Sequence, residues 1–296
     1  MTRPVIGFIG LGLMGSAMVE RLQSLGYPMV VLANRSRGNV DAAVKRGAKE
    51  VKTARELAAA AEIVMLCMDR STSVEARMFG TDGVIAGLKP GMLVCDFGTS
   101  LPSSTLKIAA EVAKTGAHYM DTPLGRSPAH AKEGKLNVMA AGAAEDFARV
   151  EPVLRDLGEN VFHVGPLGAG HTAKLINNFF AMTTIVAMSE AFAMADKAGL
   201  PRDKLYAVMS AGPLRSGMMD IVKAEAIDRD RSKLAFAIVN GAKDIGYYAE
   251  TAEALGQTSL VAPGPLKAMR DAVDAGWGDK YVAEMVDYLA ARFANG

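Results

Sequence analysis

The sequence predicts a doubly wound α/β domain over residues 1–164, followed by an all-helical domain over residues 165–296. Three observations lead to this prediction. Short apolar runs alternate with helical patterns in the first half, a glycine-rich turn follows the first of these runs, and strand-like runs fade after residue 164. Strands that alternate with helices are typical of a parallel sheet that is covered by helices on both faces.

The strands of the first domain are expected where apolar residues follow one another without polar alternation. Continuous hydrophobicity is typical of parallel strands, because helices cover both faces of their sheet. The pattern after the first run is helical, and Gly26 is the expected residue just past the end of that helix. The four clearest runs are residues 5–9, 29–33, 63–66 and 92–95.

The second domain follows a segment rich in glycine and proline, residues 165–170. One long helix is predicted from Lys174 to Ala198, because Gly199 and Pro201 are typical signals for the end of a helix. Its uncharged part is shorter than the roughly 20 apolar residues that a membrane span needs, so we expect a helix buried in protein. Further helices are predicted at residues 202–210, 236–255, 264–275 and 281–293.

Composition and charge exclude several classes of protein. The chain has 296 residues, of which 50% are hydrophobic and 22% charged, and its formal net charge is +1. This balance argues against disorder and gives no electrostatic reason to bind nucleic acid or an anionic membrane. The two cysteines, Cys67 and Cys95, lie far apart, and the four histidines lack metal-ligand spacing. We therefore expect no disulfide, no metal site, no catalytic thiol and a cytoplasmic location.

A glycine-rich turn after the first strand predicts a dinucleotide site. In the pattern G-x-G-x-x-G, the first glycine permits a tight turn, the second lets the backbone approach a pyrophosphate, and the third allows close packing of helix on strand. The amino end of the helix faces the phosphates. A strand, this turn, a helix and a second strand arrive in order, which is typical of a Rossmann domain. The residues of the turn, all expected to contact the cofactor, are Gly10, Leu11, Gly12, Leu13, Met14 and Gly15.

The end of the second strand indicates which dinucleotide is preferred. Sites for NAD usually place an acidic residue there to bind the ribose 2′-hydroxyl, whereas this chain has Asn34, Arg35, Ser36 and Arg37. Guanidinium groups and a hydroxyl bind a 2′-phosphate well. NADP(H) is therefore the predicted cofactor, with NAD(H) as the second possibility. The alternative is that Arg35 and Arg37 are solvated loop charges.

A lysine and an asparagine near the start of the long helix form a candidate chemical site. Lys174 and Asn178 are four residues apart, so they share one face of the helix. A lysine beside a carbonyl can donate a proton to the alkoxide formed on reduction, or remove one in the reverse direction. The Asn178 carboxamide can position the substrate beside it. Spacing alone leaves an ordinary exposed helix pair equally open.

Five ordered motifs extend over almost the whole chain. They are GFIGLGLMG at residues 7–15, DFGT at 96–99, DTPLGRS at 121–127, KLINN at 174–178 and KDIG at 243–246. Their sequences and spacing resemble the β-hydroxyacid dehydrogenase family, which includes 3-hydroxyisobutyrate dehydrogenase, tartronate semialdehyde reductase and glyoxylate/succinic semialdehyde reductase. The resemblance implies an NAD(P)-dependent enzyme that interconverts a small hydroxy acid and its semialdehyde.

The resemblance also implies a role for each matching side chain. Lys174 would be the catalytic acid/base and Asn178 a substrate ligand, while Asp244 would help to order its loop. Without the resemblance, Phe236 would be interpreted as a core residue and Lys243 as a surface charge. The cofactor contacts expected outside the two segments described above are Met68, Thr99, Phe236 and Lys243.

The predicted substrate loop departs from the family pattern. Most members carry Ser-Gly-Gly where this chain has Gly125, Arg126 and Ser127. Arg126 adds a permanent charge that can make bidentate contacts to an oxyanion. The change resembles the sulfolactaldehyde reductase branch and implies a sulfonated or otherwise strongly anionic aldehyde, although Ala181 stands where that branch has a serine. The alternative is that Arg126 forms a structural salt bridge.

The sequence and the resemblance together predict an NADP(H)-dependent oxidoreductase that interconverts a small 3-hydroxy acid and its semialdehyde, with a small anionic aldehyde or hydroxy acid as substrate. The resemblance also implies a homodimer or homotetramer. Glyoxylate/succinic semialdehyde reductase is the nearest alternative activity. An imine reductase is less favoured because Lys174 is present, and a non-catalytic nucleotide-sensing scaffold is less favoured because Gly10, Lys174, Asn178 and Lys243 are all intact. His171, three residues before Lys174, either contacts substrate or caps the start of the helix.

Overall fold

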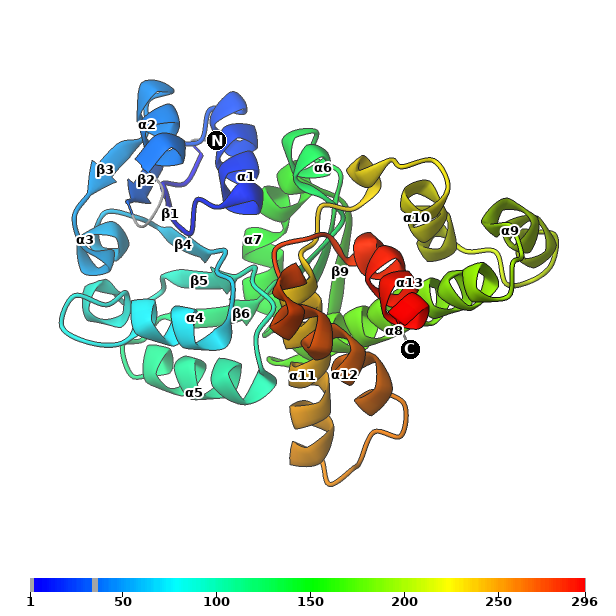
Figure 1. The fold of residues 1–296 in the computed structure, drawn as a ribbon. Helices are drawn as coiled ribbons and strands as arrows, with labels where there is room; N and C mark the ends of the chain where they lie inside the picture. Colours follow the sequence, from blue (N-terminus) through cyan, green and yellow to red (C-terminus); the bar gives the residue numbers. More distant parts are fainter. Residues whose placement is uncertain (1–2, 34–36, 296) are drawn as a thin grey trace. The chain divides into compact units, whose positions relative to one another are not determined.

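The computed structural model describes residues 3–33 and 37–295 and divides into two compact units, residues 1–174 and 175–296. The first unit is a mostly parallel sheet with helices, and the second consists of helices and connecting loops (Figure 1). This confirms the predicted fold class. The first unit ends at Lys174, inside the long helix α8 (Ala169–Lys197), so the domain boundary predicted at residue 164 stays a prediction.

The sheet has the strand order β3-β2-β1-β4-β5-β6-β8-β7, and β9 also pairs with β8. Pairing is parallel from β3 through β6; on β1, for example, Ile6 pairs with Met29 of β2 and with Ile63 of β4. The order reverses beside β1, and doubly wound sheets bind ligands at the carboxyl ends of their strands near such a point. The strands are β1 (Ile6–Ile9), β2 (Met29–Leu32), β3 (Lys49–Val51), β4 (Ile63–Leu66), β5 (Leu93–Asp96), β6 (His118–Asp121), β7 (Leu124–Gly125), β8 (Leu136–Ala141) and β9 (Gly158–Gly165).

Burial of the central strands agrees with their continuous hydrophobicity. Every residue of β1, β2, β4 and β5 is buried, although successive side chains point to opposite faces. On β1, Ile6 and Phe8 belong to one core and Ile9 to another. Side chains of α1, α2 and α7 complete the first core, and those of α3, α4 and α5 complete the second. The helices are α1 (Leu13–Ser24), α2 (Arg37–Lys45), α3 (Ala54–Ala59), α4 (Ser71–Met78), α5 (Pro102–Ala113), α6 (Pro128–Lys132) and α7 (Ala144–Leu157).

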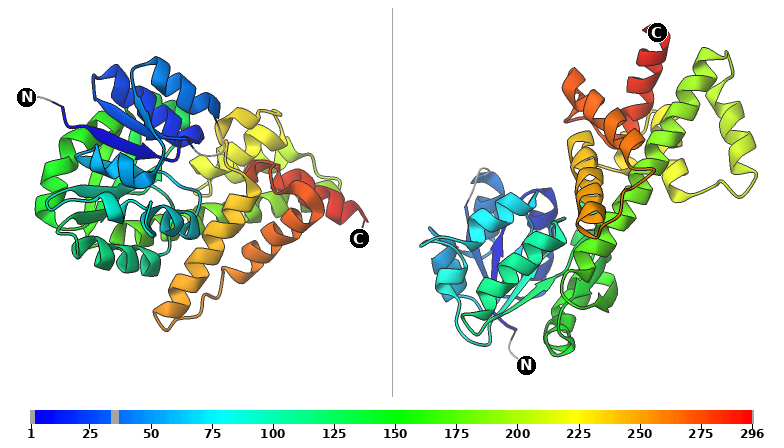
Figure 2. Two further views of the ribbon diagram at one scale, coloured as in Figure 1. Left: turned by 90° about the vertical axis from the view of Figure 1, so that its left-hand side faces the viewer. Right: turned by 90° about the horizontal axis from the view of Figure 1, so that it is seen from below.

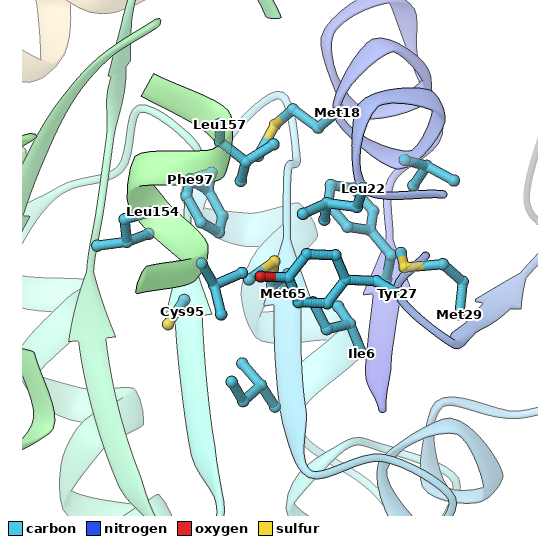
Figure 3. Close-up of a cluster of buried hydrophobic side chains, with 14 of the residues drawn as sticks. Ile6, Met18, Leu22, Tyr27, Met29, Met65, Cys95, Phe97, Leu154 and Leu157 are labelled. Carbon is cyan, nitrogen blue, oxygen red and sulfur yellow. The ribbon is translucent and has the colours of Figure 1, made fainter. Parts of the chain in front are cut away.

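The first core extends from α1 across the sheet to α7. Met18 and Leu22 of α1 and Leu154 and Leu157 of α7 belong to one buried cluster (Figure 3), and each is 0% exposed. Full burial of one such side chain contributes about 1.5–3 kcal/mol to stability. This burial therefore stabilises the sheet that carries the loops at its carboxyl edge.

Both cysteines are free thiols in this unit. Burial and the charge of Asp96 raise the pKa of the Cys67 thiol to about 12. Burial also raises the pKa of the Cys95 thiol above its ordinary value. The thiolate is the nucleophilic form of cysteine, so both side chains are poorly suited to covalent catalysis at neutral pH.

The helical unit packs around α8. Met182, Ile185 and Phe192 of α8 share one core with side chains from α10 to α13. By length and composition α8 is apolar enough to cross a membrane, but 50% of its most apolar 18-residue window is buried in the structure. The buried side chains of α8 belong to the core of this unit. The remaining helices, seen from two further sides in Figure 2, are α9 (Arg202–Ser210), α10 (Gly217–Ala226), α11 (Ile238–Ala254), α12 (Pro263–Ala272) and α13 (Met285–Asn295).

Helix ends agree with their sequence signals. Gly26 and Gly199 have φ of +82° and +72° just past α1 and α8, a conformation that glycine adopts without steric cost. Helix α9 spans the predicted residues. Helix α10 has no counterpart among the predicted helices. Ser216 caps its amino end, where the serine side chain accepts a hydrogen bond from the Met219 N–H. Strands β3 and β6 to β9 have none either. Of these, β8 pairs with β6, β7 and β9.

Candidate functional site

The glycine-rich turn between β1 and α1 is tightly packed at two of its glycines and open at the third. Gly10 has φ +98°, and a Cβ there would lie 2.3 Å from the Cys67 carbonyl oxygen. A Cβ at Gly15 would lie 1.9 Å from the Gly10 carbonyl oxygen. A Cβ at Gly12 would meet nothing within 4 Å. Gly12 is also the N-cap of α1, and it offers no side chain to bind the first N–H groups of the helix.

These features fit the pyrophosphate of a dinucleotide. Unpaired N–H groups at the start of a helix attract phosphate, and a glycine with open space beside it lets the anion reach the backbone. Leu13 is 74% exposed at this opening, whereas Leu11 is buried and Met14 is half-buried. A Cβ at Gly10 would lie 3.0 Å from the Met68 sulfur, so Met68 lies against the turn.

Arg37 is the one residue of the predicted 2′-phosphate site that the structure describes. It opens α2, and its guanidinium binds the carboxylates of Asp41 and Glu50. Donation from Arg37 holds the pKa of Glu50 below its ordinary value. A bound 2′-phosphate would compete with Glu50 for this guanidinium. The residues of that site that lie outside the described ranges are Asn34, Arg35 and Ser36.

Asp96 shapes the loop that carries Thr99. Asp96 ends β5 and is 1% exposed; its Oδ1 accepts from the Gly98 N–H at 2.9 Å and its Oδ2 from the Ser100 hydroxyl at 3.1 Å. Thr99 lies between these two anchors and is half-buried. A Cβ at Gly98 would lie 3.0 Å from the Met68 carbonyl oxygen, so the loops after β4 and β5 meet. Thr99 is therefore on the edge of the sheet where a doubly wound domain binds its ligand.

Arg126 is tied to the fold by an ion pair. Its guanidinium donates to the Glu159 carboxylate on β9 and to the Lys135 carbonyl oxygen. Gly125 and Ser127 flank it, at the end of β7 and at the N-cap of α6. These contacts favour the structural salt bridge that the sequence left open. Sequence reasoning missed Glu159, because it lies 33 positions away and only the fold brings it to Arg126.

Asp244 fixes two of the predicted site residues in the helical unit. Asn178 is 7% exposed, and its Nδ2 donates to the Asp244 Oδ2 at 2.6 Å. The Lys243 Nζ lies 2.9 Å from the Asp244 Oδ1, and the Lys243 side chain is 16% exposed. Lys243 is thus less exposed than an ordinary surface lysine, and Asn178 is buried, unlike a residue on an exposed helix face. Phe236 packs half-buried against the core of the same unit.

The start of α8, which leads to Lys174, is buried in the first unit. The cap of this helix is Asp121, whose two carboxylate oxygens accept from the Gly168 and His171 N–H groups at 2.8 and 2.7 Å. The His171 side chain is 0% exposed, with its Nδ1 2.6 Å from the Thr105 hydroxyl. His171 therefore does not cap the helix with its ring. Among residues 3–33 and 37–295 no group of three or more His, Cys, Asp or Glu side chains could hold a metal ion.

Comparison with known proteins assigns both parts of the chain. Residues 5–165 match the family described as the NAD binding domain of 6-phosphogluconate dehydrogenase, and residues 168–289 match the NAD-binding domain of NADP-dependent 3-hydroxyisobutyrate dehydrogenase. The chain is 31% identical to 2-(hydroxymethyl)glutarate dehydrogenase of Eubacterium barkeri, over 81% of this chain and 80% of that protein. It is also 31% identical to 2-hydroxy-3-oxopropionate reductase of Escherichia coli, over 84% and 85% respectively. A crystal structure of 3-hydroxyisobutyrate dehydrogenase from Salmonella typhimurium superposes with a TM-score of 0.82 at 28% identity, covering 96% of this chain and 99% of that one.

The open space at Gly12 predicts that two glycine substitutions separate binding from folding. Gly12→Ala should leave the thermal midpoint unchanged and raise the Kd for the dinucleotide about tenfold, because the methyl group occupies the space where the pyrophosphate approaches. Gly15→Ala should instead lower the free energy of unfolding by about 1–3 kcal/mol through overpacking. Calorimetry of unfolding and of dinucleotide binding measures both effects. Unchanged affinity in Gly12→Ala would contradict the assignment of this turn.

The pairing of Asp244 with two side chains predicts a large effect of its removal. Asp244→Ala should lower the free energy of unfolding by about 1–3 kcal/mol, since it removes the acceptor of the buried Asn178 amide and the carboxylate beside the Lys243 ammonium. The matched control is Asp228→Ala, which removes an exposed carboxylate that binds Lys223; about 0–1 kcal/mol is expected there. Urea denaturation compares the two. Equal losses of unfolding free energy in the two variants would show that the contacts of Asp244 contribute no more than an exposed ion pair.

Proposed function

The chain belongs to the β-hydroxyacid dehydrogenase family, and from this premise we propose that it is an NADP(H)-dependent enzyme that interconverts a small 3-hydroxy acid and its semialdehyde. Family membership makes it an NAD(P)-dependent hydroxyacid dehydrogenase; the proposal adds the preferred cofactor and the substrate class. One observation carries it. Asn178 is buried and held by Asp244 one helical turn after Lys174. A fixed amide beside a lysine can keep a carbonyl within reach of a proton donor.

Lys174 acts as the acid and base of the proposed reaction. When bound, the nicotinamide supplies the hydride for reduction of the aldehyde carbon and accepts it in the reverse direction. The Lys174 ammonium donates a proton to the carbonyl oxygen as that oxygen gains negative charge, and the neutral amine removes it from the hydroxyl during oxidation. The Asn178 amide orients the substrate, and Gly12 with the start of α1 holds the pyrophosphate.

The substrate is proposed to be small and anionic. The names of two relatives, 2-(hydroxymethyl)glutarate dehydrogenase and 2-hydroxy-3-oxopropionate reductase, describe substrates with carboxylate groups. Gly125, Arg126, Ser127 and Asn178 are each proposed to contact such a group. Because the Arg126 guanidinium already binds Glu159, we favour a carboxylate held by the backbone of this loop and by the Ser127 hydroxyl, which lies 2.7 Å from the His130 Nδ1. A sulfonated aldehyde such as sulfolactaldehyde is the second candidate, on the ground that Arg126 brings a permanent charge to this loop.

NADP(H) is proposed as the preferred cofactor on the sequence after β2. Residues 34–37 contain two arginines, a serine and no acid, a combination that suits a 2′-phosphate. Arg37 is shared with Glu50 and Asp41, so we assign the larger part of the phosphate selectivity to Arg35.

A homodimer or homotetramer is proposed from the surface of α8. Ile176, Phe180 and Met194 are 53%, 72% and 55% exposed. Their separations of four and eighteen residues correspond to about one and five helical turns, so the three lie on one side of the helix. An apolar stripe of this kind is typical of a surface that associates with another copy. The free thiols of Cys67 and Cys95 accord with the proposed cytoplasmic location.

Turnover of a panel of aldehydes tests the activity. NADPH oxidation should be observed with methylmalonate semialdehyde, succinic semialdehyde, glyoxylate or sulfolactaldehyde, and Lys174→Ala should lower kcat by about 10²–10⁴ without changing the Kd for NADPH. Binding of NADPH without turnover of any aldehyde acid would favour a nucleotide-sensing scaffold. Reduction of imines that survives Lys174→Ala would favour an imine reductase.

The same panel decides the role of Arg126. Arg126→Gly and Glu159→Gln should change the KM for carboxylate and sulfonate substrates by similar factors, because each variant breaks the same structural ion pair. If wild type prefers the sulfonate, and Arg126→Gly but not Glu159→Gln abolishes that preference, Arg126 binds the substrate and the sulfonate candidate stands.

Cofactor preference is tested with single arginine variants. Arg35→Ala should lower the ratio of kcat/KM for NADPH to that for NADH about tenfold or more, and Arg37→Ala should lower it less, since Arg37 is shared with two carboxylates. Steady-state kinetics with both cofactors give the ratio. Equal efficiency of wild type with NADH and NADPH would refute the preference.

A further inference from the structure

Four side chains form a polar cluster in the interior of the first unit. Asp96, Thr105, Asp121 and His171 come from β5, α5, β6 and α8, and none is more than 1% exposed. Polar groups are costly to bury unless each has a partner, so a cluster of this kind constrains the segments that contribute to it. The proposed function assigns no role to Thr105 or to His171.

Asp121 fixes the helix that leads to Lys174. Its carboxylate accepts two backbone N–H groups at the start of α8, and a charge-assisted bond of this kind is stronger than a neutral one. Gly170 confirms how closely the helix start lies against the sheet, because a Cβ there would be 2.5 Å from the Met139 carbonyl oxygen. Lys174 follows His171 by three residues, so its position along the helix depends on this anchor.

Asp96 fixes the loop that carries Thr99, through its bonds to Gly98 and Ser100. The same carboxylate accepts a long hydrogen bond from the Tyr119 hydroxyl at 3.4 Å. Asp96 and Asp121 end neighbouring parallel strands and pair directly in the sheet register. Two buried carboxylates thus stand side by side, one holding the loop and the other holding the helix.

The His171 ring lies between these two carboxylates. Its Nε2 is 3.7 Å from the Asp96 Oδ2 and has no hydrogen-bond partner among the described residues, and its Nδ1 is 3.9 Å from the Asp121 Oδ2. The Thr105 hydroxyl is 2.6 Å from the His171 Nδ1 and 3.2 Å from the Leu101 carbonyl oxygen. The Thr105 hydroxyl donates to the Leu101 carbonyl oxygen and holds the ring at Nδ1, so the Nε2 edge of the ring faces Asp96.

We propose that His171 is a positioning residue that sets the loop at residues 97–100 and the first turn of α8 relative to each other. Its ring contacts the carboxylate that holds the loop, and its backbone N–H binds the carboxylate that holds the helix. The consequence for catalysis rests on the proposed roles of Thr99 and Lys174. A displacement of about 1 Å between reacting groups can lower a rate by about 10².

His171→Leu is the first test, because leucine fills part of the volume and removes both ring nitrogens. We expect kcat to fall about 10- to 100-fold while the substrate KM and the Kd for NADPH stay within about twofold. His171→Gln retains an N–H donor that can face Asp96 and should recover part of kcat. The matched control is His118→Leu, which removes another histidine–aspartate contact, to Asp146, at the opposite end of β6. That control should lower stability and leave kcat within about twofold.

Hydrogen–deuterium exchange separates this proposal from the proposed activity. His171→Leu should accelerate exchange in peptides that cover residues 97–100 and 169–176 together, and His118→Leu should accelerate neither. Unchanged exchange in the loop, or a fall in kcat that follows thermal stability equally in both leucine variants, would overturn the positioning role. Lys174→Ala is assayed beside them: full activity there would overturn the proposed function, whereas the exchange result would still decide the role of His171.

Discussion

The carboxylate of Asp121 is the interaction on which the arrangement of the first unit's candidate site depends. It stands at the carboxyl end of β6, in the interior, and accepts two N–H groups from the start of α8. Four N–H groups at the start of any helix lack a partner within the helix, and a buried helix start must find them elsewhere. Here the sheet provides that partner, so the register of the sheet also sets the register of the helix that bears Lys174.

In the helical unit, too, a buried carboxylate holds groups of the candidate site in place. Asp244 divides its two oxygens between the Asn178 amide and the Lys243 ammonium. Each of these two groups would be mobile on an exposed helix surface, and each is fixed here by one buried acid. In both units a residue with no direct part in the proposed chemistry determines where the reactive or binding groups lie. Replacement of Asp121 or Asp244 is therefore expected to change the orientation of the reactive and binding groups before it changes the affinity for a ligand.

The sequence predicted most of the scaffold, because local signals determine it. Continuous apolar runs became the buried strands β1, β2, β4 and β5, and Gly26 and Gly199 ended their helices. The elements that were missed gain their form from distant partners, as β8 and β9 do from each other. Site residues divide in the same way. The turn at Gly10 to Gly15 has its own pattern, whereas the partners of Arg126, His171 and Asn178 lie tens of residues away and leave no local signal.

Arg126 shows how such a distant partner changes the interpretation of a motif. Its φ of +76° is in the left-handed region, where backbone strain costs a residue other than glycine about 1–3 kcal/mol of conformational free energy. The family pattern has glycine at this position. The backbone conformation of the loop therefore agrees with the family pattern, although the Arg126 side chain does not. The Glu159 carboxylate and the Lys135 carbonyl offset part of that strain. It follows that glycine at position 126 preserves the loop conformation, and any change in substrate preference in that variant reports on the side chain and its charge.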